Sequence, residues 1–70
     1  MPITIAPLNV TLKVIKLLST EKVKKHLANL GITLNSEITV IASSGGNVIV
    51  NVKDGRIALD HNLASKIFVA

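Results

Sequence analysis

Four side chains in this sequence could contribute to a transition-metal site: Glu21, His26, Asp60 and His61. Imidazole and carboxylate groups bind such ions, but a stable site needs several of them close together, and cysteine is absent. The adjacent Asp60 and His61 follow no familiar ligand spacing. We therefore expect Asp60 to cap a helix, both histidines to be solvated, and no metal or other cofactor to be bound.

The sequence contains no combination of residues typical of an enzyme. It has no thiol nucleophile, its serines lack a histidine and an acid in any recognised arrangement, and its four carboxylates are scattered. The segment Gly45-Gly46-Asn47 could suggest a phosphate-binding loop, but neither a helix nor a Gly-Lys-Ser/Thr motif follows it. We expect a hairpin turn there and a protein without catalytic activity.

Two groups of residues are candidates for binding a partner. Three lysines, Lys22, Lys24 and Lys25, lie in a segment with a helical pattern, and such a basic face either is simply solvated or meets an acidic patch on a partner. The second group lies in predicted turns, where loops and strand edges are open to peptides. It consists of Gly45, Gly46, Asp54, Gly55 and Arg56.

Composition argues against several other partners. The chain has 70 residues with eight Lys+Arg against four Asp+Glu, a net charge of +4, but the positive residues are spread from Lys13 to Lys66. Phe68 is the sole aromatic residue, so base stacking has almost no platform and we expect no nucleic-acid partner. No run of roughly 18 apolar residues and no cationic leader are present. We expect a cytoplasmic protein that does not insert into a membrane.

Alternation of apolar and polar residues predicts five short strands. They cover residues 10–17, 37–43, 48–52, 57–59 and 66–69. In the first two strands we expect one face to point inward, formed by Val10, Leu12, Val14, Ile38, Val40 and Ala42. Turns at Gly45-Gly46 and Asp54-Gly55 would join the middle strands as hairpins, because glycine, Asn and Asp tolerate the backbone conformations of tight turns.

A helix is predicted over about residues 20–30. Ser19 and Thr20 supply capping hydroxyls, and Gly31 and Ile32 are suited to a Schellman ending. Apolar residues recur at i, i+4 and i+7 as Val23, Leu27 and Leu30. A short helical turn near residues 61–65 would begin after Asp60.

Five short strands with tight turns make a small curved sheet whose edges are best removed by closure. We therefore expect a mainly β fold, a small SH3-like five-stranded barrel with one inserted helix, forming a single domain over residues 1–70. Its core should include Leu27, Leu30, Val40, Val50, Leu59 and Ile67.

The order of the motifs resembles the FeoA family, the small partners of the membrane iron permease FeoB. The resemblance rests on Ala6-Pro7-Leu8, Leu27-x-x-Leu30-Gly31-Ile32, Ile38-x-Val40, Gly45-Gly46-Asn47-Val48-Ile49-Val50, Arg56-Ile57-Ala58-Leu59 and Ala64-x-x-Ile67-x-Val69. Two positions depart from the family pattern. Leu34-Asn35 replaces a Pro-Gly-like turn, and Leu17-Leu18 stands where a glycine is often found.

The resemblance implies an SH3-like fold, no enzymatic activity, and a role in ferrous iron uptake through binding and modulating a FeoB-type permease. A second possibility is a stand-alone regulatory barrel, similar to the C-terminal domain of iron-dependent repressors. A repressor also needs a DNA-reading helix and a dimerisation element, which 70 residues filled by a barrel leave no room for. The sequence leaves the oligomeric state open.

Overall fold

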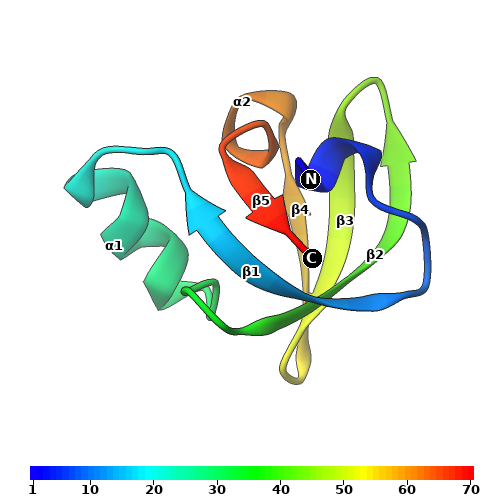
Figure 1. Ribbon diagram of the computed structural model, residues 1–70, viewed down its shortest axis with the longest axis horizontal. Helices are drawn as coiled ribbons and strands as arrows, with labels where there is room; N and C mark the ends of the chain where they lie inside the picture. The colour runs from blue at the N-terminus through cyan, green and yellow to red at the C-terminus, as the bar shows by residue number, and fades with distance from the viewer.

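The computed structural model describes residues 1–70 as one curved antiparallel sheet with short helices before and between its strands (Figure 1). The strand order is β4-β3-β2-β1-β5. The elements are η1 (Ile3–Ile5), β1 (Thr11–Leu17), α1 (Glu21–Asn29), β2 (Glu37–Ser44), β3 (Asn47–Val52), β4 (Gly55–Leu59), α2 (His61–Ala64) and β5 (Ile67–Val69). The predicted five strands, the inserted helix and the short second helix are confirmed.

The interior is entirely aliphatic. Thirteen residues are buried and none of them is polar or charged. Strand β3 shows how the sequence produces this core, because Val48, Val50 and Val52 alternate strictly with exposed residues. Five of the six predicted core residues are buried at 2% exposure or less. The core is Ile3, Val14, Leu27, Ile32, Ile38, Val40, Val48, Val50, Val52, Leu59, Ala64, Ile67 and Val69.

Leu30, the sixth predicted core residue, is only half-buried. It is the C-cap of α1, and the chain reverses directly after it through Gly31 at φ +92°. The amide of Ile32 donates to the carbonyl of Leu27 at 2.9 Å, and the amide of Gly31 donates to that of Ala28 at 2.9 Å. These two bonds form the predicted Schellman ending, and fully buried Ile32 takes the interior place expected for Leu30.

Two inward assignments in the first strands are also wrong. Val10 precedes β1 and follows a turn in which Asn9 has a φ of +64°, and it is 43% exposed. Ala42 is exposed because the register between β2 and β3 shifts between Val40 and Ala42. A β-bulge adds one residue to a strand, so the alternation of faces reverses beyond it.

The two edge strands of the sheet, β5 and β4, differ in what lies beside them. Pro2 forms an isolated bridge with Phe68, and the amide of Val69 donates to the carbonyl of Met1 at 2.7 Å, so the first residues border β5. Figure 1 shows the two ends of the chain close together there. No strand borders the outer side of β4, which leaves β4 as the open margin of the sheet.

Neither α1 nor α2 has the length and apolar character that a membrane crossing requires.

Candidate partner-binding surface

The predicted turn at Gly45-Gly46 is confirmed and also positions α2. Both glycines have positive φ, +59° and +86°, and they link the paired residues Ser44 and Asn47 in a two-residue loop. This is the geometry of a type I′ turn. Asn47 Oδ1 accepts a hydrogen bond from the amide of His61 at 2.7 Å, and a methyl group added at Gly46 would overlap the His61 ring. The hairpin tip and the start of α2 therefore form one packed unit.

The second predicted turn lies one residue earlier than expected. Val52 pairs with Gly55, so the two loop residues are Lys53 and Asp54, and Lys53 has a φ of +54°. Gly55 begins β4 instead of forming the tip of the turn. Arg56 follows on β4, is exposed, and makes no ion pair.

The predicted loop residues do not form one surface. Gly45 and Gly46 precede β3, whereas Lys53 and Asp54 follow it, so the two turns lie at opposite ends of a six-residue strand. At about 3.3 Å per residue, roughly 20 Å separates them. A single small contact area cannot include both turns.

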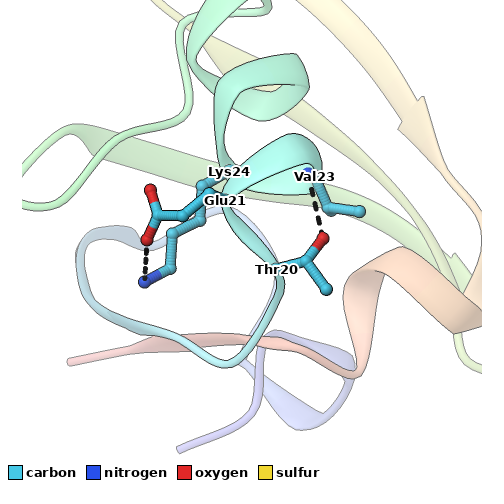
Figure 2. Close-up of polar contacts among 4 residues, drawn as sticks. All are labelled: Thr20, Glu21, Val23 and Lys24. Atoms are coloured by element: carbon cyan, nitrogen blue, oxygen red, sulfur yellow. Dashed lines mark hydrogen bonds and ion pairs between the residues drawn. The ribbon is translucent and has the colours of Figure 1, made fainter.

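The three helix lysines are close in sequence but differ in their surroundings. Lys24 Nζ lies 3.7 Å from Glu21 Oε1, an exposed i, i+3 ion pair shown in Figure 2. Lys22 and Lys25 are exposed and have no ion-pair partner. An exposed pair of this kind contributes at most about 0.5 kcal/mol, so it only partly offsets the positive charge of Lys24.

The end of α1 lies beside the β3–β4 turn. A Cβ built at Gly31 would be 3.2 Å from Val52 Cγ1 and 3.8 Å from Lys53 Cδ. The helix exit and the β3–β4 turn thus share one end of the barrel, and Gly45 and Gly46 lie at the other end.

The outer face of the β2–β3–β4 sheet carries a hollow that the sequence did not indicate. Its volume is about 490 Å³. Ala42 pairs with Ile49, and Ile49 pairs with Ala58, so these three residues cross the strands in one apolar row. The bulge at Ile41 turns Ala42 outward, and only the break in alternation at Ile41 could have signalled this. The lining consists of Ala42, Ser43, Ser44, Asn47, Val48, Ile49, Ala58, Leu59 and Asp60.

A polar row adjoins this apolar row. Thr39 pairs with Thr11 and Asn51, and Asn51 pairs with Arg56. The hydroxyls of Thr11 and Thr39 are 3.0 Å apart and share a hydrogen bond. The outer face of the sheet therefore presents an apolar row and, beside it, a polar row that ends in the free guanidinium of Arg56.

The histidines and carboxylates are not assembled into a ligand set. No group of three or more His, Asp or Glu side chains that could hold a metal ion is found. Asp60 caps α2, and its Oδ1 accepts from the amide of Leu63 at 2.9 Å, as the sequence predicted.

An SH3-like barrel with an open strand margin is the class of fold that these observations define. The FeoA domain family matches residues 1–70, so the chain belongs to the FeoA family. A comparison with curated proteins found no match.

Solved structures share the fold. A crystal structure of an iron uptake regulatory protein, FeoA, has a TM-score of 0.89 at 23% identity, covering 99% of this chain and 93% of that chain. Iron(II) transport protein A from Clostridium thermocellum has a TM-score of 0.88 at 18% identity, over 99% of this chain and 44% of its own. FeoA from Stenotrophomonas maltophilia, complexed with zinc and described as a procaryotic SH3 domain protein, has a TM-score of 0.81 at 24% identity, over 100% and 89%. The predicted SH3-like fold and the family are thereby confirmed.

Proposed function

We propose that this chain is a non-catalytic, cytoplasmic accessory protein of ferrous iron uptake that binds and modulates a FeoB-type membrane iron permease. The observation that carries the proposal is the match to the FeoA domain family over residues 1–70. The role in ferrous iron transport is suggested by the family, and the FeoB-type permease is the specific partner that we propose.

The chemistry of the chain supports a binding role. Its interior is aliphatic throughout, and the interactions of its polar side chains are caps, turn contacts, a hydroxyl pair between Thr11 and Thr39 and one exposed ion pair. A protein with such a surface influences transport through the protein that it binds, because it has no group positioned to act on a substrate. The iron ion is the cargo of the permease in this proposal.

Binding kinetics test the proposal directly. The full chain would be immobilised and exposed to the FeoB-type permease of the same organism in detergent, and separately to the cytosolic domains of that permease. We expect saturable, reversible association with at least one of the two. Folded protein on both sides without measurable association at tens of micromolar would contradict the accessory role and favour a stand-alone regulatory barrel.

A transport measurement tests the modulating role. Ferrous iron uptake would be followed in cells that lack this chain and in the same cells after its return. We expect uptake through the permease to fall without the chain and to recover with it. Unchanged uptake at equal permease abundance would contradict the modulating role, whether or not the chain binds the permease.

A further inference from the structure

The open side of β4 offers unpaired backbone groups to an added strand. Val52 and Gly55 flank the two-residue loop, and in such a hairpin the flanking pair is hydrogen-bonded while successive pairs alternate. In the pairs Val50–Ile57 and Val48–Leu59, the β4 residues Ile57 and Leu59 are then also hydrogen-bonded to β3. The amides and carbonyls of Arg56 and Ala58 point away from β3, and none of the backbone bonds outside the helices and strands involves them.

The side chains beside this margin are exposed and chemically distinct. Arg56 and Ala58 both lie on the outer face of β4 and are both exposed. Ala58 borders the apolar hollow, in which Ile49 is 38% exposed. Arg56 ends the polar row and has no carboxylate partner. A strand laid along β4 would meet an apolar position and a cationic position two residues apart.

The usual ligand mode of SH3-like folds does not suit this surface. Proline-rich peptides in the polyproline II conformation bind to aromatic-lined grooves, and this chain has one Phe and neither Trp nor Tyr. That Phe is part of β5, next to Pro2, at the other margin of the sheet. Backbone pairing needs no aromatic groove, because hydrogen bonds of the main chain supply the affinity.

Charge complementarity indicates which kind of strand would bind. The chain carries a net charge of +4, and β4 (Gly55–Leu59) contains no acidic residue. A second copy of the chain pairing through its own β4 would therefore bring no carboxylate from that strand to Arg56. A segment with an acidic side chain at this level would form an ion pair there.

We propose that β4 binds an extended segment of the partner protein by strand addition. The segment pairs with the backbone of Arg56 and Ala58, places an apolar side chain over the hollow at Ala58, and places a carboxylate beside Arg56, two positions away. The inference rests on the proposed function in taking the permease as the protein that supplies the segment. The kind of segment that binds is set by β4 itself, through its unpaired backbone groups, the hollow at Ala58 and the charge of Arg56.

Amide exchange in two parallel experiments tests the proposal. The first adds the permease in detergent to the isotopically labelled full chain. The second adds a short capped peptide that alternates valine with threonine and carries one glutamate two positions from a valine. We expect exchange at the Arg56 and Ala58 amides to slow at least about tenfold in both experiments, because an added strand would cover these donors.

Variants of β4 separate strand addition from other contacts. Ala58→Pro removes one outward amide without removing a bond to β3, and proline is tolerated on an edge strand in that orientation. We expect its affinity for the permease and the peptide to fall about tenfold, the effect of one hydrogen bond worth 1.4 kcal/mol. Ala58→Thr keeps the amide and controls for the side chain. Arg56→Glu should weaken binding about threefold to tenfold, and Lys13→Glu, which changes the charge equally on β1, less than twofold.

The outcomes distinguish the two proposals. Permease binding without protection of Arg56 and Ala58, and unaffected by Arg56→Glu and Ala58→Pro, would overturn strand addition while the accessory role stands. Peptide binding at β4 without permease binding would support the strand site and overturn the accessory role. Absence of protection with both ligands would overturn strand addition. Arg56→Glu changes one exposed side chain and keeps the test decisive if Ala58→Pro is unfolded.

Discussion

The hydroxyl groups of Ser19 and Thr20, just before α1, differ in their hydrogen bonding. Thr20 is the N-cap, and its Oγ1 accepts a hydrogen bond from the amide of Val23 at 3.3 Å (Figure 2). Ser19 Oγ is buried and has no hydrogen-bond partner. The sequence predicted a capping role for both residues, since both side chains have the required chemistry. Which of them caps depends on where the strand before the helix ends, and residue type alone does not specify that.

Substitution of these two residues tests their different roles. Thr20→Ala should lower the free energy of unfolding by about 0.5–1 kcal/mol, the lower range for a lost cap, because the bond is long. Ser19→Ala should leave stability within about 0.5 kcal/mol or raise it, since it removes an unsatisfied buried oxygen. Urea titrations of the two variants would measure both values. A larger loss for Ser19→Ala than for Thr20→Ala would show that Ser19 is the cap.

Helix α1 contributes one buried residue to the core, and Val23 packs partly buried against that core. Leu27 is its only buried residue, although the spacing of Val23, Leu27 and Leu30 predicted a continuous apolar face. The Schellman ending makes the difference, because it turns the chain at Gly31 and puts Ile32 into the core. Leu27→Ala should therefore cost about 2–5 kcal/mol and Leu30→Ala about 1 kcal/mol or less. Equal losses in denaturant titration would mean that Leu30 also anchors the helix.

The β2–β3 hairpin and α2 are coupled through a contact at Gly46. Gly45→Ala and Gly46→Ala both place a methyl group at positive φ, which costs about 1 kcal/mol. Nothing lies within 4 Å of a Cβ at Gly45, whereas a Cβ at Gly46 meets the His61 ring. Gly46→Ala should therefore cost about 1–3 kcal/mol more than Gly45→Ala. Adding His61→Ala should recover most of that difference, and a double-mutant cycle measures it. Full additivity would place His61 away from the turn.

Much of this fold could be predicted from the sequence because local patterns and tertiary structure agree. Strict alternation in β3, the Gly45-Gly46 turn and the Leu30-Gly31-Ile32 helix exit each specify their own geometry. The bulge in β2 is different, since Ile41 and Ala42 fit either face and only packing against β3 decides between them. The hollow on the outer face depends on that bulge. Composition and alternation therefore predicted the barrel, and the turn pattern indicated Arg56, but neither predicted the hollow beside Ala58.

At the scale of the whole molecule, positive charge is distributed over several faces. Lys22 and Lys25 lie on α1, Lys13 and Lys16 on β1, and Arg56 on the open margin of the sheet. Charges on exposed faces act mainly on the rate of encounter, whereas a paired strand acts on the rate of dissociation. The two candidate contact modes therefore differ in which rate constant they control.

Reversal of the helix charges separates the two modes. If α1 steers association, the triple variant Lys22→Glu, Lys24→Glu, Lys25→Glu should associate with the permease more slowly than the parent at low salt. The difference between the two association rates should largely vanish near 0.5 M salt, because screening there shortens the reach of exposed charges to about 4 Å. A control with the same change in net charge, Lys13→Glu, Lys16→Glu, Lys66→Glu, should slow association less. Circular dichroism would confirm that α1 persists without the ion pair between Lys24 and Glu21. Equal slowing in both variants would assign the effect to net charge. If the triple variant on α1 instead associates within about threefold of the parent rate at low salt, steering by α1 is excluded, and β4 and the turns remain as the surfaces that determine affinity.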